Sequence, residues 1–306
     1  MSVASAARVL YRRSSAREFT NLPPESKVNG GFEPSPAVVE PASMSFLRAL
    51  PTLVVLVVAA CSEPGQTEIA RGNVLASQKR YDEALAAYRA AGAAQPRCAH
   101  PRELAGHLLF DLRRYGEARR AYEEAEGLEP NDALEARIGL ARLDAEEQRL
   151  DDALAGLNVI LEKRPDNLYA LLSRATVALR RNRPGDLETA ISDTAKAMAI
   201  DSKSGAVLYA RGSAFIAAKE YEQAAQAFAL LQRAHPRSPL AFYGYARLAS
   251  IREDRAGALA NLRRARNAAE DQLGGWNPRQ VRADPAFARL KDDPEFVEIV
   301  DSRLAR

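Results

Sequence analysis

Residues 72–96 read GNVLASQKRYDEALAAYRAAGAAQP, and residues 106–130 read GHLLFDLRRYGEARRAYEEAEGLEP. The second stretch begins 34 residues after the first and repeats five residue types at the same offsets. In the first stretch these are Gly72, Ala84, Tyr88, Ala91 and Pro96. A constellation that returns at a fixed period predicts a stack of similar structural units.

The spacing inside each unit predicts a helical hairpin. Tyr81, Ala84, Tyr88 and Ala91 follow one another at steps of three and four, the period of one buried stripe on an α-helix. Small residues such as Gly72 and Ala84 allow two antiparallel helices to approach closely, and the tyrosine fills the gap to the next pair. The closing proline ends the second helix because it lacks an amide donor.

The pattern continues downstream with varying strength. The fifth copy is clear, the third has one inserted residue, and the sixth lacks the closing proline. The fourth keeps only small residues around a longer turn, so its second helix is expected to be out of register. These copies lie at Ala141, Ala153, Leu157 and Pro165; at Ala175, Ala190 and Ala197, with the turn at 182–186; at Gly212, Ala224, Phe228 and Pro236; and at Ala246, Ala258, Leu262 and Ala265.

These residues resemble the tetratricopeptide repeat family, whose unit has 34 residues with a small residue, an aromatic and a closing proline at these offsets. The resemblance covers residues 65–266. It implies an all-α fold, a right-handed α-solenoid of about six helical hairpins with a C-terminal helical cap. We expect the array over residues 67–266 and the capping helices over residues 267–306. The first three copies depart from the family where it places a large apolar residue, at Glu68, Arg102 and Arg137.

The residues after the sixth copy have a different character, with Trp276 and two Asp-Pro steps at Asp284 and Asp293. An aspartate followed by a proline in the first turn is typical of a helix start, so each step predicts a short helix. Repeat arrays need a cap over the exposed end of the stack. The residues expected to cover it are Phe287, Leu290, Phe296, Ile299 and Val300.

The composition fits a globular protein with a sizeable core. The chain has 306 residues, of which 47% are hydrophobic and 27% charged, with a formal net charge of +3. A charge this close to zero, with no RNA-binding motif, gives no reason to expect a nucleic-acid partner.

One segment departs from the amphipathic pattern. The uncharged run over residues 49–62 is shorter than the roughly 20 residues of a membrane-spanning helix and is typical of the apolar core of an export signal. Ala59 and Ala60 before Cys61 resemble the lipobox of bacterial lipoproteins. That resemblance implies a signal peptide over residues 44–60 and lipid attachment at Cys61. The alternative is a buried core helix in a longer cytoplasmic protein.

The flanking residues add two expectations. Met44 to Arg48 supplies the basic region that precedes the core of a signal peptide, so we take Met44 as the true start. Residues 1–43 are then a non-native or disordered extension, and residues 61–66 are the lipidated cysteine and a tether. Ser62 after the cysteine is similar to lipoproteins that are passed on to the outer membrane. We therefore expect a lipid-anchored protein of the cell envelope that faces the periplasm.

The sequence gives no sign of catalysis. The histidines lie outside any recognisable nucleophile turn, and there is no phosphate-binding glycine loop. Cys98, His100 and His107 lack the paired ligand spacing of a zinc site. We expect no enzyme, no metal and no cofactor. If Cys61 is lipidated, Cys98 has no intramolecular disulfide partner.

The resemblance also predicts a binding surface, because in this family one face of each first helix lines a concave groove. Tyrosines and arginines there would suit an extended or helical peptide of a protein partner. The plainer interpretation is that some of the tyrosines pack between repeats. The lysine and asparagine set of the family's chaperone-tail clamp is missing. The predicted groove residues are Ile69, Asn73, Glu103, His107, Ile138, Arg142, Tyr169, Leu172, Thr176, Tyr209, Ser213, Tyr243 and Arg247.

These expectations combine into one function. The sequence predicts a membrane-anchored scaffold for protein–protein interaction, which assists the assembly or regulation of an envelope complex. Pilus or secretin assembly, insertion of outer-membrane β-barrels and control of cell-wall hydrolases all fit. The alternative is a non-lipidated cytoplasmic regulatory or adaptor module translated from Met1.

Overall fold

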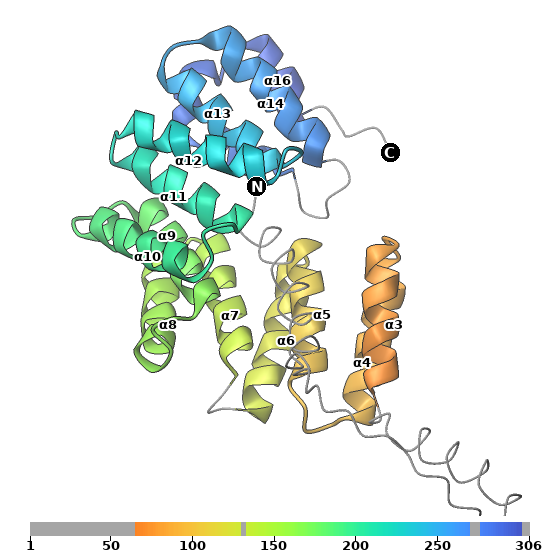
Figure 1. The fold of residues 1–306 in the computed structure, drawn as a ribbon. Coiled ribbons are helices and arrows are strands. Elements are labelled where there is room, and N and C mark those ends of the chain that lie inside the picture. Colours follow the sequence, from red (N-terminus) through yellow and green to blue (C-terminus); the bar gives the residue numbers. More distant parts are fainter. Residues whose placement is uncertain (1–64, 130–132, 270–275, 302–306) are drawn as a thin grey trace, which may run out of the picture.

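The computed structural model describes residues 65–129, 133–269 and 276–301, and every regular element in these ranges is a helix. The helices up to residue 269 form six antiparallel hairpins, which confirms the predicted all-α solenoid (Figure 1). Their bounds are α3 (Gln66–Ser77) and α4 (Tyr81–Ala94); α5 (His100–Asp111) and α6 (Tyr115–Leu128); α7 (Leu134–Glu146) and α8 (Leu150–Lys163); α9 (Leu168–Arg181) and α10 (Asp186–Ile200); α11 (Gly205–Ala217) and α12 (Tyr221–Ala234); α13 (Pro239–Ile251) and α14 (Arg255–Ala269).

Several of the residues named above lie outside the described ranges. They include the start at Met44, the apolar run that precedes Cys61, Cys61 itself and the closing Pro130. None of the helices in the described ranges has the length and apolar character needed to cross a membrane.

The first and second helices of the hairpins form two layers. From α5 onward each first helix contacts the first helix of the next hairpin, as α5 does with α7 and α11 with α13. A second helix instead contacts the first helix that follows it, as α8 does with α9. The more closely spaced layer of a curved stack lies on its inside, so the first helices form the concave side of the array. We call this side the inner face.

An aromatic ring from the second helix locks neighbouring hairpins together. Phe228 of α12 is fully buried and lies against two glycines, Gly212 of its own hairpin and Gly244 of the next. A β-carbon at Gly244 would come within 2.6 Å of the Phe228 ring. Tyr122 of α6 is wedged between two glycines in the same way. The small residues of the repeat pattern are therefore needed because a ring occupies the space of their side chains.

The turn inside each hairpin holds one residue other than glycine in the left-handed region, with φ between 52° and 66°. In five of the hairpins the next residue donates its backbone N–H to a carbonyl five positions earlier, as Arg114 does to Leu109 at 2.9 Å. This bond satisfies one of the carbonyls left open at the end of the first helix. The six left-handed residues are Lys79, Arg113, Gln148, Asn182, Lys219 and Glu253.

The fourth hairpin has a different turn and a different core. The Asp186 carboxylate accepts the backbone N–H of Arg183 at 2.8 Å and pairs with Arg181 at 2.6 Å. Thr194 stands four residues after Ala190, where the other hairpins carry an aromatic or a leucine, and it is fully buried. Its hydroxyl donates to the Ala190 carbonyl at 2.8 Å. The weakest copy of the sequence pattern is thus a hairpin in which polar contacts replace the ring.

Three short helices follow the last hairpin, and the two predicted at the Asp-Pro steps pack against it. The first Asp-Pro step begins a 3-10 helix that packs on α13, and the second begins an α-helix that packs on α14. Asp284 accepts the backbone N–H of Ala286 at 3.0 Å, and Asp293 accepts that of Phe296 at 3.2 Å. The three elements are α15 (Pro278–Ala283), η1 (Pro285–Leu290) and α16 (Pro294–Asp301).

Asp284 joins this cap to the inner face of α13. Its carboxylate accepts a hydrogen bond from the Tyr243 hydroxyl at 2.9 Å and lies 3.1 Å from Nε of Arg247. Burial, and then the Asp284 carboxylate, raise the pKa of Tyr243 well above its ordinary value. Burial disfavours the charge of Arg247, but Asp284 holds the pKa of this guanidinium above its ordinary value. Ser250 adds a hydrogen bond to the Ala286 carbonyl at 2.7 Å.

The ring wedge predicts opposite effects for two glycine substitutions. Gly244→Ala should destabilise the chain by about 1–3 kcal/mol, because the new methyl group collides with the Phe228 ring. Gly127→Ala places a methyl group in open space on α6 and should stabilise it by up to about 1 kcal/mol. Urea unfolding followed by circular dichroism measures both. Equal shifts for the two variants would contradict the wedge.

The cap anchor predicts a strong effect at Asp284. Asp284→Ala should lower the free energy of unfolding by about 3 kcal/mol, because it leaves Arg247 buried without its carboxylate. The matched control is Asp301→Ala, whose ion pair with Arg282 is exposed and should contribute less than about 1 kcal/mol. The same urea titration compares the two. An Asp284 variant as stable as the control would remove the anchor role.

Candidate functional site

All thirteen predicted groove residues lie on first helices. Four of them are buried among the helices and offer little surface: Ile69, Ile138, Leu172 and Tyr243. Asn73 is exposed, and the others are half-buried: Glu103, His107, Arg142, Tyr169, Thr176, Tyr209, Ser213 and Arg247. The predicted lipid-attachment residue, Cys61, lies outside the described residues.

The tyrosines of the repeat pattern reach from the core to the inner face. The Tyr88 hydroxyl donates to Oδ1 of Asn73 at 2.8 Å. The Tyr122 hydroxyl lies 2.8 Å from Nδ1 of His107, and the two rings meet edge to face with centroids 5.4 Å apart. Burial raises the pKa of Tyr122 above its ordinary value, so its hydroxyl keeps its proton at neutral pH. The core therefore fixes the side chains at the centre of the inner face.

Arg142 on α7 has no carboxylate partner among the described residues. Its guanidinium lies over the ring of Phe110 on α5, 4.2 Å from the ring centroid, in a cation–π contact. Its Nη2 atom is buried and has no hydrogen-bond acceptor. The Phe110 ring packs in turn against Tyr115 of α6, with centroids 5.5 Å apart. The second and third hairpins thus hold a stacked cation on the inner face.

Glu135 lies seven residues before Arg142, on the same side of α7. Burial raises the pKa of Glu135 to about 7, and the Glu103 carboxylate acts in the same direction, against the opposing effect of Arg142 and His100. The charge of this part of the inner face therefore changes near neutral pH.

The cap occupies the inner face of the last hairpin. The Asp284 carboxylate binds the Tyr243 hydroxyl and lies against the Arg247 guanidinium, as described above. Arg247 also donates from Nη1 to the Ser213 hydroxyl at 2.9 Å, and the Tyr209 and Tyr243 rings lie with centroids 6.5 Å apart. Tyr243 and Arg247 thus contact the cap, and through them the cap is connected to Tyr209 and Ser213 of the fifth hairpin.

The cap also contacts the second hairpin. Arg113, in the turn between α5 and α6, donates from Nη2 to the Trp276 carbonyl at 2.8 Å and from Nη1 to Oδ1 of Asn277 at 3.3 Å. The indole N–H of Trp276 donates to the Val300 carbonyl of α16 at 3.3 Å. Hydrogen bonds therefore connect the cap to a turn that lies four hairpins before it.

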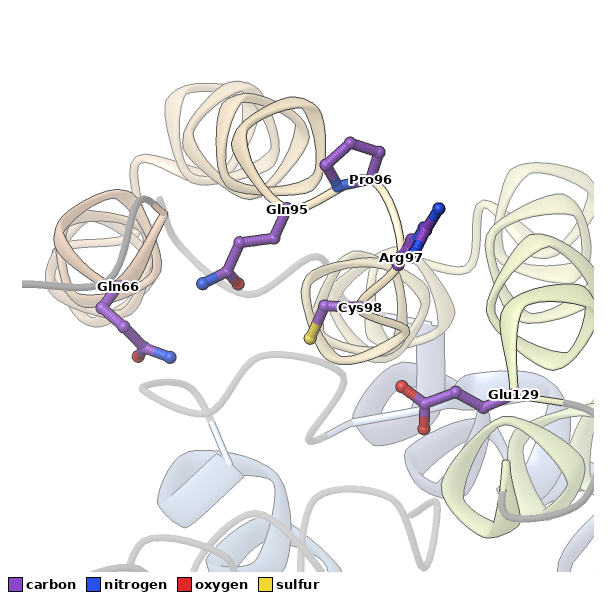
Figure 2. Close-up of a pocket in the computed structure, with 6 residues that line it drawn as sticks. All are labelled: Gln66, Gln95, Pro96, Arg97, Cys98 and Glu129. Carbon is purple, nitrogen blue, oxygen red and sulfur yellow. The ribbon is translucent and has the colours of Figure 1, made fainter.

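A cavity of about 580 Å³ opens at the turns between the first two hairpins. Figure 2 shows Gln95 and Cys98 directed into the space between Gln66 and Glu129. Glu129 accepts the backbone N–H of Ala99 at 3.1 Å, whereas Oε1 of Gln95 is buried without a hydrogen-bond donor. None of the predicted groove residues lines this cavity.

Cys98, His100 and His107 were considered above for a metal site. In the described parts of the chain, no three His, Cys, Asp or Glu side chains are placed to hold a metal ion. Cys98 is a half-buried free thiol, and the ring of His107 contacts the Tyr122 hydroxyl.

Sequence reasoning did not select Phe110, Glu135 or Asp284 for the inner face. The sequence could have indicated Glu135, because a residue seven positions before Arg142 lies on the same side of a helix. It could not have indicated Asp284, because that residue lies outside the repeats and meets Arg247 only through the fold of the cap.

Comparison with known proteins agrees with this geometry. Residues 109–175 match the sequence profile of the tetratricopeptide repeat. A thermophilic tetratricopeptide repeat protein of Thermus thermophilus has a similar structure, with a TM-score of 0.53 and 21% identity over 62% of this chain and 99% of that chain. No curated protein matches the chain.

Two further solved structures are similar. PilW, described as a widely conserved type IV pilus biogenesis factor, gives a TM-score of 0.54 and 13% identity over 65% of this chain and 90% of its own. The protein pilF of Pseudomonas aeruginosa gives 0.51 and 15% over 72% of this chain and 96% of its own. Identities this low show the fold alone. The described helices therefore form a tetratricopeptide repeat fold, and residues 109–175 carry the sequence pattern of that repeat.

Proposed function

We propose that this chain is a membrane-anchored scaffold that holds protein partners on its inner face in the bacterial cell envelope. The observation that carries the proposal is that the hairpins and the cap account for all of the described helices. From Gln66 to Asp301 every described helix belongs to a hairpin or to the cap. Stacked hairpins build extended concave surfaces, and such surfaces serve protein–protein interaction.

The inner face of the earlier hairpins supports this role. In the last two hairpins the groove residues contact one another, and Asp284 of the cap binds Tyr243 and Arg247, whereas Asn73 on the first hairpin is exposed. Polar and aromatic side chains on a rigid helical surface suit an extended or helical peptide. The partner is therefore assigned to the first four hairpins.

The anchor in this proposal is a lipid on Cys61. Ala59 and Ala60 before it resemble a lipobox. α3 begins at Gln66, and an extended chain spans at most about 3.5 Å per residue between Cys61 and that helix. The first hairpin would then lie within about 18 Å of the lipid attachment point. Two or three acyl chains give stable anchoring, whereas one chain gives only marginal binding.

For the envelope process we propose only a general class of function. PilW, which shares the fold, is described as a pilus biogenesis factor, and assembly of an envelope complex is the class we propose here. Ser62 after the cysteine favours delivery to the outer membrane. No catalytic step is part of this proposal.

The lipid anchor predicts a labelling result. Bacteria expressing the chain and fed a clickable fatty acid should label the wild type and leave Cys61→Ala without label, because the thiol carries the lipid. Fluorescence of the immunoprecipitated chain measures the incorporation. Label on both forms would overturn Cys61 as the attachment site, and label on neither would favour the non-lipidated cytoplasmic module.

The scaffold role predicts which face captures proteins. Photo-reactive residues at Asn73 and Thr176, on first helices, should cross-link to partner proteins in cells. The matched controls are Val159 and Leu230, which are exposed on second helices and should give at least fivefold less cross-linked product. Equal products from the two sets would mean that the inner face is not the partner surface.

A further inference from the structure

Arg142 and Arg247 occupy corresponding places three repeats apart, each directly after the first small residue of its copy. Both project from the inner face of a first helix, and one nitrogen of each guanidinium is buried without a hydrogen bond of good geometry. The two sites differ in what stands opposite them. Arg247 therefore indicates which group an arginine at this repeat position can bind.

At Arg247 the chain itself supplies a carboxylate. Asp284 Oδ2 lies 3.1 Å from Nε of Arg247 and accepts the Tyr243 hydroxyl, while Ser250 binds the Ala286 carbonyl two residues on. The Phe287 ring then meets the Tyr243 ring edge to face, with centroids 5.7 Å apart. One aspartate at the start of a helical turn, with an aromatic three residues later, thus lies along α13.

At Arg142 no such group is present among the described residues. The guanidinium is held over Phe110, and its Nη2 has no acceptor. Arg142 opposes the rise in the pKa of Glu135 on the same helix, but the two side chains form no ion pair. A buried donor without an acceptor is unfavourable, and a carboxylate that reached this guanidinium would form a charge-assisted bond.

We propose that Arg142 binds a carboxylate of a protein partner that lies along the inner face, on an aspartate at the start of a helical turn. This inference rests on the proposed scaffold role and specifies the chemistry of the partner. The stacking on Phe110 presents the guanidinium in one orientation, so less side-chain freedom is lost on binding. The segment Asp284–Phe287 serves as the internal example of such a ligand.

The test uses the purified full chain and a fluorescent peptide, VRADPAFARL, which reproduces residues 281–290. Fluorescence anisotropy should show binding to the wild type. Replacing the peptide aspartate by asparagine should weaken binding at least tenfold, and so should Arg142→Gln in the chain. Arg142→Lys, which keeps the charge but not the planar fork, should retain part of the binding.

The matched control is Arg137→Gln. Arg137 lies on the same helix and pairs with Glu126 at 2.8 Å, so this variant removes the same charge away from the site and should bind the peptide as the wild type does. Urea unfolding of each variant separates lost binding from lost structure.

Three results would overturn the proposal. The peptide could fail to bind, or the aspartate and asparagine peptides could bind equally well. The peptide could also bind Arg142→Gln as tightly as the wild type, which would place it at Arg247 by displacement of the cap. These results leave the cross-linking at Asn73 and Thr176 unaffected. If that cross-linking succeeds while the peptide fails, the assignment of Arg142 falls and the scaffold role stands.

Discussion

The array depends on contacts in which an aromatic ring of a second helix, Tyr122 or Phe228, presses against the backbone of two first helices. The ring of Phe228 takes the volume of side chains that Gly212 and Gly244 do not have. Close approach on this side brings consecutive first helices together and leaves the second helices further apart, which curves the stack. Where the ring carries a hydroxyl, as in Tyr88 and Tyr122, it also orients the inner-face residue above it.

The two halves of the inner face differ because the chain ends in a cap. At the far end, Asp284 binds Tyr243 and Arg247, so those side chains hold the cap on the last hairpin. Nearer the start, Arg142 stays stacked on Phe110 without a carboxylate. The same residue type in the same repeat position is a core component in one hairpin and open for an interaction in another.

The periodic sequence was enough to predict the hairpins and the cap, because the copies repeat the small residues on which two helices approach closely, and most of them repeat a large apolar side chain four residues later. Even the weak fourth copy was visible, although the buried Thr194 and its hydrogen bond to Ala190 were not. The site was harder to predict. Spacing placed Tyr243 on the inner face but could not show that it is buried, because its cover comes from Asp284, outside the repeats. Cation stacking on Phe110 joins two hairpins and likewise leaves no trace in the spacing.

A stack of hairpins joined only to their neighbours behaves as a spring that can lengthen under load. The hydrogen bonds from Arg113 to Trp276 and Asn277 change this, because they tie the second hairpin to the far end of the array. Pulling the two ends apart must break these bonds before the coil can extend. A protein held at one end and loaded at the other would therefore resist small forces and yield abruptly at larger ones.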